Sequence, residues 1–137
     1  MRSLVWAIKG SLLEYVRRMP DGSVALDGVT EVAGGFSFPA IDAESFSGSV
    51  TLVGHDGMMH VVIADPAVLR TDTGWLLTIA DDTSPGGRLP FATIVSLDDR
   101  GDGVRTAATT RLTADGADLF FGPYREGTPL DDPRITV

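Results

Sequence analysis

Most of this chain consists of short apolar runs separated by turns rich in glycine and aspartate. The runs are rich in β-branched and aromatic residues, and one follows another roughly every ten residues, as in antiparallel sheets whose strands are joined by tight turns. The turn His55-Asp56-Gly57 falls between two of the strongest runs, and Ala114-Asp115-Gly116 falls between two others. We predict strands over Ser23–Leu26, Gly35–Phe38, Ser49–Val53, Met58–Ala64, Trp75–Ile79, Phe91–Leu97, Arg105–Leu112 and Asp118–Phe121.

Only the segment that precedes these runs has a helical period. Its apolar residues recur four apart, at Leu4, Ile8, Leu12 and Val16. Ser3 is a candidate N-cap, and Met19-Pro20-Asp21-Gly22 would end the helix, so we predict a helix over 3–18. The expected fold is mainly β (α+β): an antiparallel β-sandwich or flattened barrel with one N-terminal helix packed across it. Residues 1–137 are expected to form a single domain.

Charge and cysteine content exclude several classes of function. The chain has 11 basic and 19 acidic side chains and a net charge of -8, which repels phosphate, so nucleic acid and anionic membranes are poor partners. It has no cysteine, which excludes disulfides, thiolate metal sites and thiol catalysis. No run approaches the ~20 apolar residues of a membrane span, and we find no signal peptide. We therefore expect no membrane insertion and favour a cytoplasmic location.

The familiar catalytic and metal-binding motifs are missing or incomplete. There is no phosphate-binding loop, dinucleotide fingerprint or G-x-S-x-G nucleophile motif. The run from Asp98 to Gly103 resembles a calcium loop, but Arg100 occupies a ligand position. His55 and His60 could begin a zinc site, but no third ligand stands at a recognised spacing. A solvated hairpin turn and an ordinary strand histidine explain these residues better.

Tyr15 and His55 can supply a different chemistry if the fold brings them together. A free phenol has a pKa near ~10, so it is a poor iron ligand at neutral pH unless ferric iron and a hydrogen-bond donor stabilise the phenolate. An adjacent imidazole can be that donor. Ser11 lies four residues before Tyr15 and points the same way on a helix. Without such a partnership, Tyr15 is a half-buried helix tyrosine and Tyr124 packs on Pro123.

Four segments together closely resemble the HtaA (haem-transport-associated) domain. They are Trp6-Ala-Ile-Lys-Gly-Ser-Leu-Leu-Glu-Tyr15, Gly48-Ser-Val-Thr-Leu-Val-Gly-His-Asp-Gly57, Asp65-Pro66 and Gly116-Ala-Asp-Leu-Phe-Phe-Gly-Pro-Tyr-Arg-Glu-Gly-Thr-Pro-Leu-Asp131. The resemblance covers nearly the whole chain, and the combination of the tyrosine helix with Gly-His-Asp-Gly is fairly specific. Members of this family are secreted or surface-exposed modules that capture haem and pass it to a membrane-anchored carrier.

The resemblance implies a site for ferric haem b. It implies that Tyr15 is the axial ligand of the iron, that His55 hydrogen-bonds the Tyr15 oxygen, and that Tyr124 lines the same pocket. Ser11 would meet a haem propionate or orient the site. Met58 follows the histidine turn closely enough to touch the porphyrin, whereas we expect Trp6 to belong to the core.

The function that this resemblance implies is reversible, non-covalent haem binding for capture, storage or transfer. Haem is then the main partner, with a haem-donor or haem-acceptor protein and a homodimer as further possibilities. Two alternatives stay open. One is a haem-dependent enzyme, peroxidase-like or haem-degrading, for which His60 is the remaining histidine. The other is a haem-free β-sandwich that binds a partner through exposed aromatic residues such as Trp75.

Overall fold

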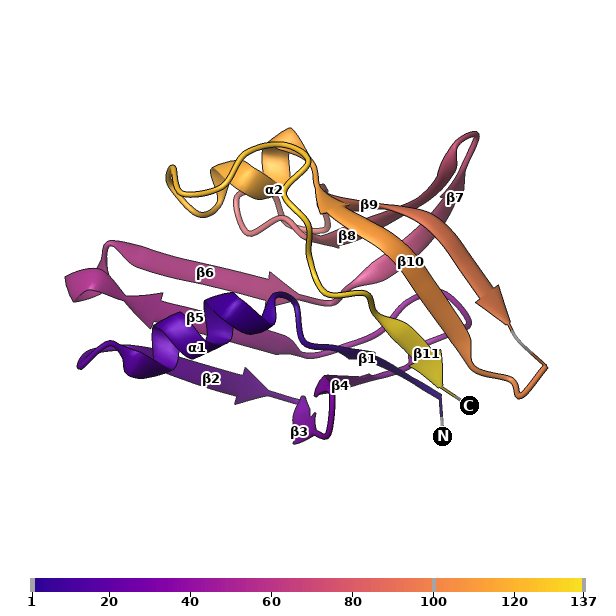
Figure 1. Ribbon diagram of the computed structural model, residues 1–137, viewed down its shortest axis with the longest axis horizontal. Coiled ribbons are helices and arrows are strands. Elements are labelled where there is room, and N and C mark those ends of the chain that lie inside the picture. Colours follow the sequence, from indigo (N-terminus) through magenta and orange to yellow (C-terminus); the bar gives the residue numbers. More distant parts are fainter. Residues whose placement is uncertain (1, 100, 137) are drawn as a thin grey trace.

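The computed structural model describes residues 2–99 and 101–136, which form two antiparallel sheets, two α-helices and one 3₁₀ turn (Figure 1). In chain order the elements are β1 (Ser3–Trp6), α1 (Gly10–Arg18), β2 (Ser23–Asp27), β3 (Thr30–Val32), β4 (Gly35–Pro39), β5 (Ser49–Gly54), η1 (His55–Gly57), β6 (Met59–Ala64), β7 (Ala67–Thr71), β8 (Gly74–Ala80), β9 (Arg88–Asp99), β10 (Arg105–Leu112), α2 (Ala114–Asp118) and β11 (Arg134–Thr136).

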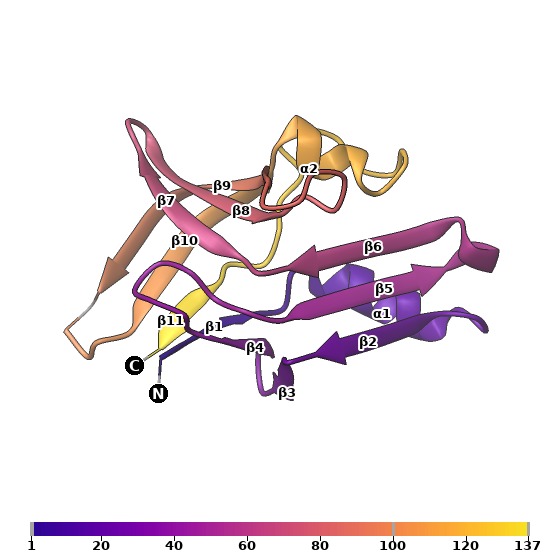
Figure 2. The same ribbon diagram turned by 180° about the vertical axis from the view of Figure 1, so that it is seen from behind.

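The smaller sheet has three strands in the order β2-β5-β6, and α1 packs across it. Figure 1 shows the helix in front of β5, and the reverse view in Figure 2 shows it behind that strand. Leu12, Leu13 and Val16 are the buried residues of the helix. Because these positions recur at three- and four-residue intervals, they form the apolar stripe of an amphipathic helix and leave Tyr15 on the half-exposed flank.

The larger sheet has eight strands in the order β3-β4-β1-β11-β10-β9-β8-β7. Its inner face and the smaller sheet enclose one hydrophobic core. The largest fully buried side chains of the core are Trp6, Phe36, Phe38, Phe46 and Phe91. The sheets do not close into a barrel, so the sandwich is the correct form of the predicted fold. No described helix is both long enough and apolar enough to span a membrane.

The prediction of a helix over 3–18 is wrong for its first residues. Ser3–Trp6 is strand β1, which lies between β4 and β11 and pairs antiparallel with both. The helix begins only at Gly10, with Lys9 as the N-cap residue, and Ser3 instead places its hydroxyl 2.9 Å from that of Thr136. Ile8 has a φ of 65°, in the left-handed region that a β-branched residue rarely adopts, and this separates the strand from the helix.

The prediction of a strand over Asp118–Phe121 is also wrong. Ala114–Asp118 is the short helix α2, and the hydroxyl of Thr113 caps it by accepting a hydrogen bond from the Gly116 amide. Ala114-Asp115-Gly116 is therefore a helical turn rather than a link between two strands. Three further strands, β3, β7 and β11, were not predicted. The other seven predicted strands are present, with boundaries that differ by at most a few residues.

Candidate functional site

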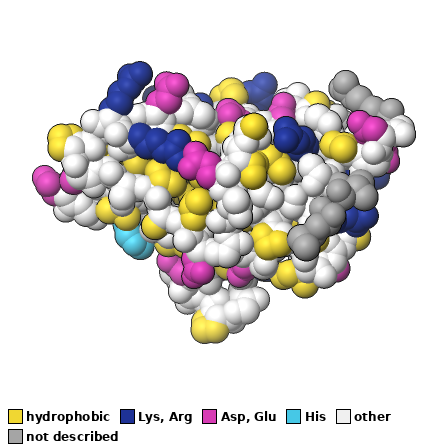
Figure 3. Space-filling view, turned by 90° about the horizontal axis from the view of Figure 1, so that it is seen from below, with side chains coloured by type: hydrophobic (Ala, Val, Ile, Leu, Met, Phe, Trp, Pro, Cys, Tyr) yellow, Lys and Arg dark blue, Asp and Glu magenta, His cyan; other side chains and the backbone are white. Residues whose placement is uncertain are grey.

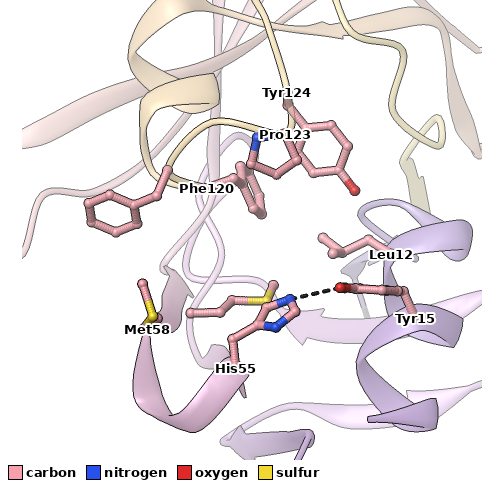
Figure 4. A pocket seen from close by; sticks show the side chains of 9 residues that line it. Leu12, Tyr15, His55, Met58, Phe120, Pro123 and Tyr124 are labelled. Atoms are coloured by element: carbon pink, nitrogen blue, oxygen red, sulfur yellow. Dashed lines mark hydrogen bonds between the residues drawn. The ribbon is translucent and has the colours of Figure 1, made fainter.

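A cavity of about 810 Å³ opens between α1, the η1 turn and the segment that follows α2 (Figure 4). Most of its lining is apolar, and its polar side chains are Tyr15, His55 and Tyr124. The apolar residues that line it are Leu12, Met58, Met59, Phe120, Phe121 and Pro123. A largely apolar cavity with a few convergent polar groups is the usual form of a site for a small organic ligand or cofactor.

Tyr15 and His55 meet at the wall of this cavity. The Tyr15 hydroxyl oxygen lies 2.7 Å from His55 Nε2, although the residues are far apart in sequence. The ring centroids are 5.6 Å apart and the planes are tilted by 45°, so the contact is a hydrogen bond rather than a stack. Half of the Tyr15 surface is exposed, which leaves its oxygen accessible from the cavity. The structure thus brings together the two residues singled out from the sequence.

The helix that carries Tyr15 is fastened at its N-terminal end to the C-terminal part of the chain. The buried Trp6 donates its indole N–H to the carbonyl of Asp131 at 2.7 Å, and the Asp131 amide donates to the carbonyl of Ile8 at 2.9 Å. Lys9 donates its ammonium to the carbonyl of Pro129 at 3.1 Å. These three contacts fix where α1 begins and hence where Tyr15 lies.

His55 belongs to a hairpin turn with an unusual backbone. The strands β5 and β6 pair up to Gly54 and Met59, which confirms the predicted hairpin. Within the turn, His55, Asp56 and Gly57 have φ angles of 51°, 54° and 85°. The turn is closed by the amide of Met58, which donates to the carbonyl of His55 at 3.0 Å. This conformation directs the imidazole towards α1.

The opposite wall of the cavity is formed by the segment after α2. Phe120 is buried, and Tyr124 packs edge-on against it with the ring centroids 5.1 Å apart. Burial raises the pKa of the Tyr124 phenol above its ordinary value, and the nearby Tyr15 phenol adds to the rise. Tyr124 therefore stays neutral at physiological pH. Phe121, at the edge of this wall, is 79% exposed.

Two other predicted site residues have different outcomes. Met58 lines the cavity and is 80% exposed. Ser11 is exposed and lies on α1 one turn before Tyr15, but it is not among the lining residues. The lining residues that were not predicted are Leu12, Phe120, Phe121 and Pro123. Their clustering comes from the packing of α1 against the segment after α2, and only the resemblance to a known domain pointed to that segment through Tyr124.

The described residues do not assemble the zinc site considered from the sequence, and Arg100 of the calcium-like run lies outside the described residues. Among the described residues, no three His, Asp or Glu side chains are grouped as metal ligands. His60 is exposed on β6 and does not line the cavity. Asp99 accepts hydrogen bonds from the amides of Gly101 and Gly103 at 2.7 and 3.2 Å, so its carboxylate closes the β9–β10 turn. Trp75 was a candidate exposed aromatic residue, but it is partly buried against the core.

The surface charges are mixed. On the face shown in Figure 3, Lys and Arg side chains alternate with Asp and Glu and with apolar side chains. Arg17 and Glu31 form an exposed ion pair, with 3.0 Å between Arg17 Nη2 and Glu31 Oε2.

Comparison with models of protein families identifies one family. The family model described as Htaa (HtaA) matches residues 1–136. None of the curated proteins searched matches the chain. Among solved structures, the C-terminal domain of HtaA from Corynebacterium glutamicum has a TM-score of 0.73 and 24% identity, and the comparison covers 98% of this chain and 93% of that domain.

Two further structures show the same fold. For the N-terminal domain of HtaA from Corynebacterium glutamicum the TM-score is 0.75 at 22% identity, covering 99% of this chain and 96% of that domain. For a domain-swapped dimer of a variant of the C-terminal domain the TM-score is 0.58 at 22% identity, covering 93% and 92%. At this identity the structural likeness shows the fold alone. The family model covers nearly the whole chain, and the chain therefore belongs to the HtaA family, which is associated with haem transport.

Proposed function

We propose that this protein binds ferric haem reversibly and non-covalently, with the Tyr15 phenolate as the axial ligand of the iron. The observation that carries the proposal is the 2.7 Å hydrogen bond between the Tyr15 oxygen and His55 Nε2 at the wall of an apolar cavity. Haem is the cargo in this proposal, and its capture, storage or transfer is the function. Membership of a family associated with haem transport supports the choice of ligand.

The phenol and the imidazole divide the chemistry between them. To bind iron, the Tyr15 hydroxyl must lose its proton, which it does not do readily near neutral pH because a free phenol has a pKa of about 10. Ferric iron stabilises the phenolate, and the His55 Nε2–H can then donate a hydrogen bond to the ligating oxygen and fix its direction. An anionic oxygen donor favours ferric over ferrous iron, so reduction weakens the bond and favours release.

The cavity suits a flat, mostly apolar molecule. Its volume of about 810 Å³ lies within the range of ordinary cofactor sites. Leu12 and Met58 on one side, and Phe120 and Pro123 on the other, supply apolar contacts (Figure 4). Burying these side chains against a porphyrin contributes about 25 cal/mol for each Å² removed from water. We propose that Ser11, which is exposed on α1 one turn before Tyr15, contacts a propionate or helps to orient the site.

We propose binding rather than catalysis because of the residues that form the opposite wall of the cavity, after α2. Phe120, Phe121 and Pro123 carry no group that transfers protons, and Tyr124 is a neutral phenol whose pKa is raised by burial. Peroxide chemistry needs an acid–base group near the iron on the side opposite the ligand. His60, the histidine that the enzymatic alternative would use, lies outside the lining.

A titration with ferric haem tests the ligand assignment. The wild-type protein should give a high-spin ferric spectrum with tyrosinate-to-iron charge transfer, and Tyr15→Phe should lose it. The matched control is Tyr124→Phe, which removes the chain's other phenol and should keep the charge-transfer band. His55→Ala should retain the band at a shifted position. An unchanged spectrum in Tyr15→Phe would overturn the assignment.

Two further measurements separate binding from its alternatives. Mixing the haem-loaded protein with excess apomyoglobin should transfer the haem completely, as expected for a carrier. Rapid peroxide turnover that disappears in His60→Ala would instead support an enzyme. A protein that takes up no haem, and whose tyrosine and tryptophan spectra do not respond to added haem, would support a haem-free interaction module.

A further inference from the structure

The turn that presents His55 is not held by packing. None of its three residues is buried. His55 and Asp56 both adopt left-handed backbone angles, with φ of 51° and 54°, which L residues other than glycine adopt only at a cost. An exposed turn with two such residues would open readily unless something outside it held the backbone in place. Hydrogen bonds are the remaining candidates.

One of these hydrogen bonds comes from a distant part of the chain. The backbone amide of Asp56, directly after His55, donates to a carboxylate oxygen of Asp21. Asp21 lies in the connection between α1 and β2, a few residues beyond Tyr15. A carboxylate accepting a backbone N–H forms a charge-assisted bond, which is stronger than the bond between two neutral groups.

The position of Asp21 is itself set by the end of the tyrosine helix. Gly22 donates its amide to the carbonyl of Met19 at 3.0 Å, which closes the connection tightly. A Cβ at Gly22 would lie 1.8 Å from the carbonyl oxygen of Val16, so only glycine fits there. Pro20 on the other side has a fixed φ. The backbone at Asp21 is therefore held close to the end of α1, from where the Asp21 carboxylate reaches the η1 turn.

We infer that Asp21 is a positioning residue that holds the His55 imidazole on the Tyr15 oxygen. The contacts form a closed loop: Tyr15 is joined through α1 to Asp21, Asp21 binds the turn at Asp56, and His55 returns to Tyr15. Asp21 does not line the cavity and acts only through His55. Its consequence for haem retention rests on the proposed function, whereas its effect on the turn does not.

The first test uses the haem-free protein. In Asp21→Ala, hydrogen exchange of the Asp56 amide should be about tenfold faster than in the wild type, the effect expected when a hydrogen bond to a charged group is lost. Asp21→Asn keeps an acceptor oxygen and should restore most of the protection. Asp72→Ala is the matched control, because it removes the same charge from the exposed β7–β8 turn. Unchanged exchange in Asp21→Ala would overturn the inference, whatever the ligand of the site.

The second test uses the haem-loaded protein. Asp21→Ala should shift the ferric spectrum towards that of His55→Ala and speed haem loss about three- to tenfold, as expected for part of one charge-assisted hydrogen bond. In a His55→Ala background, Asp21→Ala should add little, because both changes remove the same contact. A full additional effect in the double variant would overturn the claim that Asp21 acts through His55. If no variant binds haem, the proposed function fails while the exchange result still decides the role of Asp21.

Discussion

The two partners of the Tyr15–His55 hydrogen bond are supported in opposite ways. Tyr15 stands on a helix whose preceding strand contains the fully buried Trp6, and hydrogen bonds join the residues just before the helix to Pro129 and Asp131. His55 stands in a turn that has no buried residue. Tyr15, the proposed ligand, therefore lies on a rigid element, and its hydrogen-bond partner His55 lies on an element that can open locally.

In the proposed function the bound haem is released, and this arrangement would let release proceed without movement of the tyrosine helix. If the tyrosine helix had to move, release would disturb the core, whereas the opening of η1 breaks a few exposed hydrogen bonds. Changes on the Trp6 side should therefore cost global stability, and changes in the turn should alter haem binding with little effect on folding.

The largest effect is expected from Trp6→Ala. Trp6 is fully buried, packs edge-on against Phe91 at 5.8 Å and donates its indole N–H to Asp131. Truncation should lower the free energy of unfolding by about 3–5 kcal/mol. Urea denaturation measures this, and Trp6→Phe, which keeps a ring but loses the N–H, should lose less. If Trp6→Ala lowered the unfolding free energy by less than about 1 kcal/mol, on the order of one hydrogen bond, the N-terminal end of the tyrosine helix would not be rigid.

Gly116→Ala, in the helix α2 next to the opposite wall of the cavity, should cause a smaller loss of unfolding free energy. A Cβ at this position in α2 would lie 2.2 Å from the carbonyl oxygen of Phe91, and a backbone atom in β9 cannot move aside cheaply. Overpacking of this kind should cost about 1–3 kcal/mol and displace α2 together with the following Phe120 and Tyr124. Gly127→Ala has open space around it and serves as the control for steric crowding, although its positive φ adds some strain.

Sequence reasoning was most successful where periodicity is local. Alternation of apolar and polar residues and Gly- or Asp-rich turns located most of the strands and the hairpin at His55. It failed at β1, because Leu4 and Ile8 continue the four-residue spacing of the helix even though Ser3–Trp6 pairs with two strands. Tertiary pairing overrode the local pattern. It failed at α2 because five residues are too few to show a helical period.

The site was only partly predictable because it, too, depends on tertiary contacts that the local pattern does not show. Nothing in the local pattern places Tyr124 opposite Tyr15, and only the resemblance to the HtaA domain connected them. Asp21 could not be identified, because an aspartate after a helix and before a glycine is typical of any turn. Its role depends on the η1 turn folding back beside it, which is a property of the β2–β5 pairing.

Replacing His55 should separate haem binding from stability. His55→Gly loses a hydrogen bond worth about 0.5–1.5 kcal/mol but relieves a left-handed backbone that costs about 1–2 kcal/mol for an L residue. The unfolding free energy should therefore change by less than about 1 kcal/mol, while the ferric haem spectrum should shift as in His55→Ala.

The matched comparison is between the two replacements. His55→Ala keeps the left-handed φ of 51° without its hydrogen bond, so it should be less stable than His55→Gly by about 1 kcal/mol. Urea denaturation of both haem-free variants measures the difference. If His55→Gly were several kcal/mol less stable than the wild type, the turn would be part of the rigid framework and the contrast with Trp6 would be lost.

The smallest effect concerns the pH dependence of stability through Tyr124. Burial, and to a lesser extent Tyr15, raise the pKa of Tyr124 in the folded protein above the value of about 10 expected in the unfolded chain. As the pH rises through this range the unfolded chain loses its proton first, so the contribution is fully present below about pH 10 and is lost towards the higher folded pKa. Urea denaturation between pH 7 and about pH 11 should show a steeper alkaline loss for the wild type than for Tyr124→Phe. Tyr15→Phe should retain most of this steepness, because burial is the larger cause, and parallel curves for all three proteins would show that Tyr124 is not desolvated by the cavity wall.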